Sequence, residues 1–101
     1  MDVLMDCEMC EREMLCNEHH LIPRTNHKNK WFLKHFTIDD MKTRKLMTCY
    51  DCHSAIHRFV PDEKDLGRYY NTKKLLLAHP EIAKFVKWVK KQNGKVKKVM
   101  K

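Results

Sequence analysis

Four of the five cysteines lie in two short pairs, Cys7-x-x-Cys10 and Cys49-x-x-Cys52, at distant places in the 101-residue chain. Each pair can turn two thiolates toward one ion, and two pairs complete the four-sulfur shell that structural Zn²⁺ prefers. A redox dithiol needs only one such pair beside a βαβ pattern, which we do not find, so it is the weaker alternative. The fifth cysteine, Cys16, is interpreted as a small buried residue.

Four of the seven histidines are also grouped: His19 and His20 are adjacent, and His53 and His57 lie four residues apart. On a helix the second spacing puts both imidazoles on one face. Successive helical residues point about 100° apart, so Cys52 can face the zinc while these two histidines face elsewhere, and one helix can serve two metal sites. Adjacent strand residues point to opposite faces, so spacing alone leaves open which member of the doublet binds metal. The remaining histidines are interpreted as surface or hydrogen-bonded core residues: His27, His35 and His79.

In this order, the motifs resemble the HNH endonucleases with a ββα-metal fold and an added four-cysteine zinc knuckle. The resemblance spans about residues 5 to 60 and rests on the first Cys-x-x-Cys, on Glu18-His19-His20-Leu21-Ile22-Pro23, and on Cys49-Tyr50-Asp51-Cys52-His53-Ser54-Ala55-Ile56-His57. It implies that His20, which directly precedes two apolar residues and a proline, is the general base. It also implies that one catalytic divalent ion is bound by three histidines: His19, His53 and His57.

The position of the family's middle Asn, shortly before the second cysteine pair, holds Arg44 here, flanked by Thr43. In the family this Asn holds the hairpin loop that orients the base. Thr43 could donate a hydroxyl hydrogen bond instead, and Asn26 or Asn29 could serve from the loop that follows His20.

The activity implied by the resemblance is hydrolysis of phosphodiester bonds in DNA. An imidazole has a pKa suited to proton transfer near neutral pH, so His20 can take a proton from the attacking water. A divalent ion on the scissile phosphate would offset charge on the transition state and on the departing oxygen. A shell of neutral histidines suits Zn²⁺, Ni²⁺, Co²⁺ or Mn²⁺ more readily than Mg²⁺, which prefers oxygen ligands.

Basic residues outnumber acidic ones by 21 to 13, which gives a formal net charge of +8. Residues 1–23 carry six acids and one base, residues 24–45 carry seven bases and two acids, and residues 84–101 carry eight lysines and no acid. Such blocks attract polyanions, and a solubilising Lys-rich end is the alternative interpretation of the charge. The resemblance to the HNH endonucleases implies that the partner is DNA. We find no recognition helix rich in Arg, Asn and Gln, and sequence preference should therefore be weak. Candidate phosphate contacts follow His20 or precede the second cysteine pair: Arg24, Lys28, Lys30, Arg44 and Lys45.

The apolar pattern predicts an α+β fold. Weak alternation over 14–22 favours strands of a small hairpin around the first cysteine pair, and residues 46–48 are a short strand candidate before the second pair. Short helices are expected at 31–36 and 37–44, followed by a helix over 50–59. Further helices are predicted to open at Pro61 and Asp62, after a cap at Asn71 or Thr72, and at Pro80.

We therefore divide the chain into a ββα-metal core with its zinc knuckle over 1–60, C-terminal helices packed on that core over 61–92, and a basic, disordered tail over 93–101. The last helix carries apolar residues at helical spacing. This stripe is predicted to be core, with a homodimer interface as the alternative. Its members are Ile82, Phe85, Val86 and Val89.

The composition also narrows the class of protein. The longest apolar run, residues 75–78, is too short to span a bilayer, so no membrane association is expected. The N-terminal residues include Asp2 and Asp6 and lack a long apolar stretch, so we expect no secretory signal and a cytoplasmic protein. The leading hypothesis is a metal-dependent DNA endonuclease. The alternatives are a catalytically weak or inactive zinc-containing DNA-binding module and, last, a redox or protein-interaction role.

Overall fold

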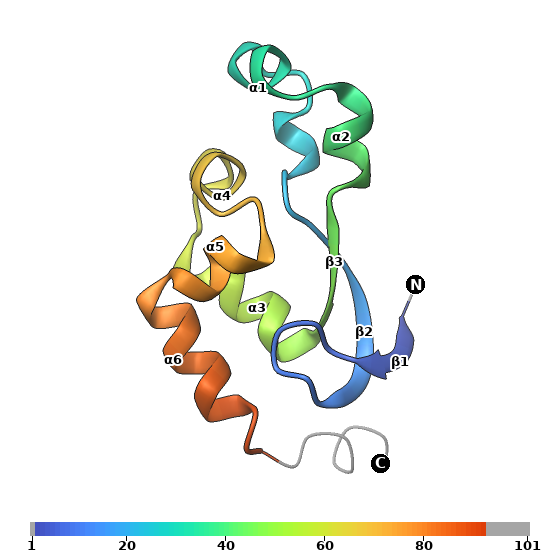
Figure 1. The fold of residues 1–101 in the computed structure, drawn as a ribbon, viewed down its shortest axis with the longest axis vertical. Coiled ribbons are helices and arrows are strands. Elements are labelled where there is room, and N and C mark those ends of the chain that lie inside the picture. The colour runs from blue at the N-terminus through green and yellow to red at the C-terminus, as the bar shows by residue number, and fades with distance from the viewer. Residues whose placement is uncertain (1, 93–101) are drawn as a thin grey trace.

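Three antiparallel strands form one sheet in the order β1-β2-β3 (Figure 1). The computed structural model describes residues 2–92. The strands are β1 (Val3–Asp6), β2 (Glu13–His20) and β3 (Lys45–Cys49). The register pairs Cys16 with Cys49 and His20 with Lys45. The sheet and the helices around it confirm the predicted α+β class.

The first cysteine pair lies in the turn that joins β1 to β2. Backbone hydrogen bonds from Cys7 N to Arg12 O (2.9 Å) and from Glu11 N to Cys7 O (2.8 Å) close this turn. The predicted hairpin is present, but its first strand, β1, precedes the cysteines, where no strand was expected. Val3 and Leu4 are exposed, so β1 is held by its ladder with β2 and has no buried apolar face that a sequence pattern would reveal.

Strand β2 buries different faces at its two ends. Met14 and Cys16 are buried near its start, whereas His19 is buried near its end. Alternate residues of a strand point to opposite sides, so His19 faces the other side from the first two. This change of side explains the weak alternation of the sequence. It directs His19 toward α3 (Tyr50–Phe59), the helix that directly follows β3.

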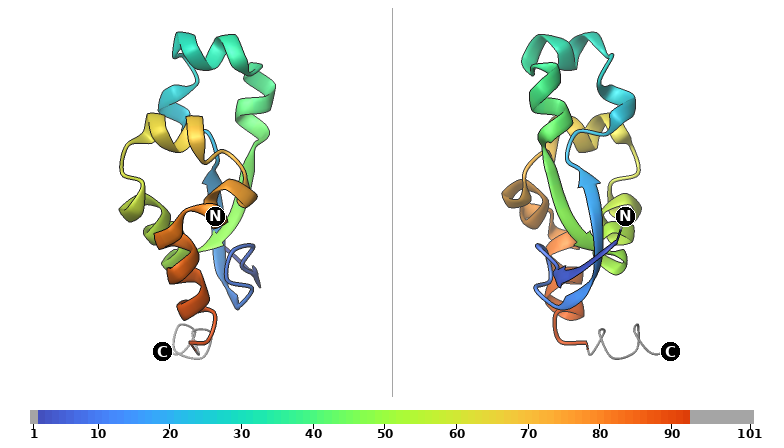
Figure 2. Two further views of the ribbon diagram at one scale, coloured as in Figure 1. Left: turned by 60° about the vertical axis from the view of Figure 1, so that its left-hand side comes forward. Right: turned by 90° about the vertical axis from the view of Figure 1, so that its right-hand side faces the viewer.

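Residues 21–44, between β2 and β3, extend to one end of the molecule, and we call them the insertion lobe (Figures 1 and 2). They contain the 3₁₀ helix η1 (Arg24–Asn26), α1 (Lys30–His35) and α2 (Ile38–Thr43). The lobe has its own buried apolar cluster, formed by Ile22, Phe32 and Met41. Both predicted short helices are therefore present, and η1 adds a helical turn to the loop expected after His20.

The helices after β3 follow one another closely along the chain. They are α3 (Tyr50–Phe59), α4 (Glu63–Tyr69), α5 (Lys73–Ala78) and α6 (Pro80–Val89). The side chains of Asp62, Thr72 and His79 accept backbone N–H groups in the first turns of α4, α5 and α6. Such caps satisfy donors that a helix start leaves unpaired, and they fix where each helix begins.

Helix α6 packs against α3 and closes the larger apolar core (Figure 1). Ile82, Val86 and Val89 are buried in the same cluster as the four paired cysteines, so the predicted core stripe is confirmed for these three side chains, which are unavailable to a dimer contact. Phe85, its fourth member, is half-buried and packs against the cluster. The predicted tail, residues 93–101, lies outside the described residues. Among residues 2–92, no helix has the length and apolar character needed to cross a membrane.

Gly67 lies in α4 where this helix meets the insertion lobe. A Cβ at this position would lie 2.8 Å from Phe32 Cε1 and 3.0 Å from Asn26 Nδ2, and Asn26 Nδ2 already donates to Glu63 O at 2.8 Å. We expect Gly67→Ala to lower the free energy of unfolding by about 1–2 kcal/mol, because overpacking outweighs the better helix propensity of alanine. Urea unfolding followed by circular dichroism measures this change, and an unchanged or higher midpoint would contradict it.

Candidate metal centres

The four paired cysteines meet at one buried point between the β1–β2 turn and the start of α3. Their Sγ atoms all lie within 4.8 Å of one another, and Cys10 Sγ lies 3.9 Å from Cys49 Sγ. A tetrahedral Zn²⁺ with Zn–S bonds of about 2.3 Å places its sulfurs about 3.8 Å apart. The cluster of Cys7, Cys10, Cys49 and Cys52 therefore fits a structural metal such as zinc.

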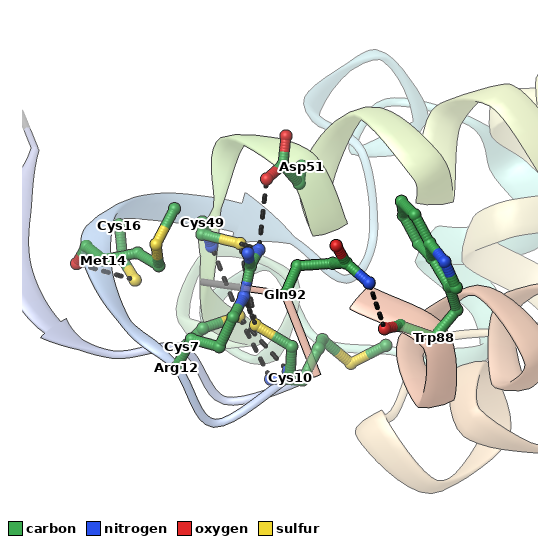
Figure 3. A network of polar contacts seen from close by, with 10 residues as sticks. Cys7, Cys10, Arg12, Met14, Cys16, Cys49, Asp51, Trp88 and Gln92 are labelled. Carbon is green, nitrogen blue, oxygen red and sulfur yellow. Dashed lines mark hydrogen bonds and ion pairs between the residues drawn. The ribbon is translucent and has the colours of Figure 1, made fainter. Parts of the chain in front are cut away.

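Hydrogen-bond donors surround these sulfurs. Cys7 Sγ accepts the backbone N–H groups of Met9 (3.4 Å), Cys10 (3.5 Å) and Cys49 (3.4 Å). Arg12 donates from Nε to Cys10 Sγ (3.2 Å) and from Nη2 to Cys49 Sγ (3.6 Å), as Figure 3 shows. Such donors favour the thiolate form. Hydrogen bonding to Cys49 and Cys52, assisted by Arg12, lowers the pKa of Cys10 below its usual value.

Arg12 also pairs with Asp51, whose Oδ2 lies 3.1 Å from Nη2 (Figure 3). The guanidinium therefore joins the first cysteine pair to the first turn of α3. Sequence reasoning did not identify Arg12, although it is the one basic residue in the acidic N-terminal segment. Cys16 is fully buried, and burial together with the charge of nearby Cys7 raises the pKa of its thiol to about 12, which confirms its interpretation as an inert core residue.

A second cluster joins β2 to α3. Its members, His19, His53 and His57, have ring nitrogens within 4.8 Å of one another, and their ring centroids are 4.9–5.4 Å apart. His19 is 1% exposed, yet neither of its ring nitrogens has a hydrogen-bond partner in the described structure. Burial and the neighbouring His53 and His57 lower the pKa of His19 to about 3. The neutral, buried imidazole of His19 has nitrogens without hydrogen-bond partners and lies beside two further imidazoles. Together the three rings provide nitrogen ligands that suit a divalent cation.

Asn17 fixes the orientation of one of these rings. Its Oδ1 lies 3.0 Å from His53 Nδ1, so an N–H at Nδ1 donates to the amide oxygen and leaves the Nε2 lone pair for a cation. Asn17 was not predicted. It lies two residues before His19 and therefore on the same side of β2, a strand-period signal that could have identified it.

We expect Asn17→Ala to weaken binding of a cation at the three histidines by about 10–100-fold, because loss of the partner frees the His53 ring and its tautomer. Titration of the protein with Co²⁺, followed by visible absorption, measures this affinity. Metal bound at the four cysteines should be unaffected, which provides an internal control within the same molecule. Unchanged Co²⁺ affinity at the histidines would contradict the assigned role of Asn17.

His20 lies beside this cluster at the end of β2. A cavity of about 230 Å³ is lined by His20 together with His19, His53 and His57, and by Arg24 and Glu63 among others. Although His19 and His20 point to opposite sides of the strand, both reach this cavity because β2 ends there. Burial lowers the pKa of His20 below its usual value. The structure thus brings together all four histidines that the sequence singled out.

A larger groove of about 650 Å³ continues from His20 across the base of the insertion lobe. Three of the five predicted basic residues line it: Arg24, Lys28 and Lys45. Lys42 lines it as well and was missed, because its position depends on how α2 leads into β3. Glu18, which pairs with Lys45 at 3.4 Å, is the acidic side chain on its wall.

The other two predicted basic residues lie elsewhere. Lys30 begins α1 and is exposed outside this groove. Arg44 donates to Asp40 Oδ2 (3.0 Å) and Asn71 O (3.2 Å), and it lies over the Phe36 ring. Arg44 therefore ties α2 to the segment before α5.

The three suggested substitutes for the family's middle Asn also make contacts away from His20. Thr43 Oγ1 donates to Asp39 O (2.8 Å), and Asn26 Nδ2 donates to Glu63 O (2.8 Å). Asn29 Oδ1 accepts the backbone N–H of Trp31 (2.9 Å) and caps α1. Thr43 and Asn29 bond within the insertion lobe and Asn26 joins the lobe to α4, and none of these bonds reaches the His20 ring.

The fold and the two clusters define a small α+β protein with two candidate metal centres on one helix. The chain is 33% identical over 87 residues to the "Uncharacterized protein YisB" of Bacillus subtilis (strain 168), and this match covers 85% of the chain and 74% of its relative. It therefore belongs to the same family as YisB. No protein-family model matches the sequence, and no solved structure matches it.

Proposed function

We propose that this protein is a metal-dependent endonuclease of the HNH type, which hydrolyses phosphodiester bonds of DNA. The observation that carries the proposal is the meeting of four histidines at one cavity beside a basic groove. Three have ligand atoms within 4.8 Å of one another, and the fourth, His20, lines the same cavity. General acid–base catalysis beside a bound cation needs such an arrangement.

The order of the supporting elements agrees with this proposal. β2 supplies His19 and His20, β3 pairs with β2, and α3 supplies His53 and His57. This order supports assignment to the ββα-metal motif that the sequence resemblance implies, with the insertion lobe between the two strands. The four-cysteine cluster fixes the start of α3 and so sets the position of both helix histidines.

A divalent ion held by His19, His53 and His57 would offset negative charge on the scissile phosphate and on the departing oxygen. His20 accepts a proton from the water molecule that attacks phosphorus. Arg24, Lys28 and Lys45 hold neighbouring phosphates along the groove, where their charge positions the backbone without reading its sequence. The neutral nitrogen donors favour Zn²⁺, Ni²⁺, Co²⁺ or Mn²⁺ over Mg²⁺.

The test is cleavage of supercoiled plasmid by protein that keeps zinc at its cysteines and has the second ion removed. We expect cleavage to return when a single divalent ion is added back, and His19→Ala to stay inactive with every ion because its cation shell is incomplete. Purified protein that never cuts plasmid with Zn²⁺, Ni²⁺, Co²⁺, Mn²⁺ or Mg²⁺ would refute the proposal.

A zinc-containing DNA-binding module with little or no catalysis is the second candidate. It is favoured by Arg44 in place of the family's Asn, since Thr43, Asn26 and Asn29 are all bonded elsewhere. Its DNA affinity should fall steeply with salt, because binding would rest on phosphate contacts, and no strand should be cut. Cleavage that His20→Ala abolishes would exclude this alternative.

A further inference from the structure

Helix α3 carries a second stripe of side chains beside its histidines. Tyr50, Ser54 and Arg58 recur every four residues and therefore share one face, adjacent to the face of His53 and His57. The Tyr50 side chain is 76% exposed, and that of Arg58 is also exposed. A ring exposed to this degree is available to stack on a group from outside the chain.

Tyr50 and Ser54 join two cavities. One, of about 350 Å³, is shared with Asn17, His53 and His57, so it opens beside the candidate cation site. The other, of about 280 Å³, lies between α3 and α6 and is lined by Arg58, Phe85 and Trp88 among others. The two cavities therefore adjoin along this face of α3, from His53 and His57 to the groove between α3 and α6, and we call them together the track.

The far wall of this track is also aromatic. Trp88 is 58% exposed and lies against Phe85, with ring centroids 5.9 Å apart. Gln92 Nε2 donates to Trp88 O (3.4 Å) and lines the groove between Arg12 and Trp88, as Figure 3 shows. The acidic lining residue, Asp51, is paired with Arg12. Exposed lysines lie near Trp88 in the sequence but do not line this cavity: Lys84 and Lys87 on α6, and Lys91 just after it.

We propose that this track binds unpaired nucleotides of the strand whose scissile phosphate lies at the histidines, with bases stacked on Tyr50 and Trp88 and a phosphate at Arg58. Exposed aromatic rings separated by cations are what single-stranded nucleic acid needs, since every base has a face that stacks and every phosphate a charge. Bases within a duplex already stack on one another and leave no face for these rings.

The inference rests on the proposed endonuclease activity and specifies its substrate class. The groove lined by Arg24, Lys28 and Lys45 is separate from the track that contains Tyr50 and Trp88. Each of them lies next to a different cavity, and His53 and His57 line both of these neighbouring cavities. The duplex part of a substrate would occupy the basic groove. The substrate is therefore DNA in which a duplex adjoins an unpaired segment, cut near the junction.

The test measures binding without cutting, with His20→Ala protein and three fluorescent DNAs: a blunt duplex, the same duplex with a single-stranded extension, and the single strand alone. We expect the extended duplex to bind about tenfold more tightly than the blunt one. Tyr50→Ala and Trp88→Ala should each remove most of this preference, and the phenylalanine variants should keep it. Tyr69→Ala is the matched control, because Tyr69 is 57% exposed on α4, outside the track.

A second measurement uses protein that retains both Tyr50 and Trp88. An extension carrying 5-iodouracil should form photo-crosslinks at Tyr50 or Trp88, located by mass spectrometry. Equal affinity for blunt and extended duplexes, or alanine variants that retain the preference, would overturn the inference. A dimer in sedimentation that Trp88→Ala dissociates would assign the groove to a second copy and overturn it as well.

The same experiment separates this inference from the proposed function. Wild-type protein that prefers the extended duplex but cuts no DNA would end the endonuclease proposal and leave the nucleic-acid track supported. Wild-type protein that cuts blunt and extended duplexes equally, with Tyr50→Ala unaffected, would end the inference alone.

Discussion

Replacing His20 by alanine is expected to slow DNA cleavage by about 10²–10⁴-fold, the contribution that a positioned general base usually makes. His20 lines the cavity that contains the three clustered imidazoles but is not a member of that cluster. Its loss should therefore leave both metal centres intact. Initial rates of plasmid nicking, together with metal content by mass spectrometry, measure the two effects in one preparation.

Two variants make this result specific. His19→Ala should lose both activity and the second ion, since His19 is the buried member of the cluster. His35→Ala should change neither, because His35 is exposed on α1 and stacks on Trp31. Cleavage by His20→Ala within a few-fold of the wild-type rate would show that another group activates the water molecule.

Loss of the metal from the four cysteines is expected to have the largest effect on stability. Cys52→Ala should lower the free energy of unfolding by about 5 kcal/mol or more, which is comparable to the whole stability of a small domain. The cluster joins the β1–β2 turn to α3, and its four sulfurs belong to the larger core. Thermal unfolding followed by circular dichroism, with and without a strong zinc chelator, measures this dependence.

Cys16→Ala is the matched control. Cys16 is as buried as the metal-site cysteines but lies outside their cluster, so its loss should cost only about 1–2 kcal/mol and leave the metal content unchanged. A chelated protein that still unfolds cooperatively near the wild-type temperature would show that the sulfur cluster is not a structural metal site.

Local sequence signals predicted the helices well. The helix expected over 50–59 and the start of the last helix at Pro80 agree with α3 and α6, because apolar spacing and a proline in the first turn act locally. β1 was missed since Val3 and Leu4 are exposed and the strand depends on pairing with β2. The face of β2 that is buried changes along the strand, and this change likewise depends on where α3 packs against the sheet.

Most members of the two clusters were predictable because Cys-x-x-Cys and the i, i+4 histidine pair fix geometry within one turn or one helix. His19 was assigned from the family resemblance alone. The partners of the two clusters were not predictable, since Arg12 and Asn17 reach across to α3 from the other side of a long loop. The basic residues show the same limit: Lys42 lines the groove while Arg44, two residues later, bonds to Asp40 and Asn71.

The insertion lobe begins at the end of β2 and ends at the start of β3, two points that lie side by side in the sheet. Leu21 N donates to Arg44 O there, at 3.0 Å. Both ends are thus pinned, and the closure entropy of a longer or shorter segment between them changes only slowly with its length. The length of this segment can therefore vary without moving the paired strands that carry His19 and His20. For protein engineering, residues 30–41 are the place to graft a foreign segment, because Arg24, Lys28 and Lys42 then stay in the groove beside the histidines.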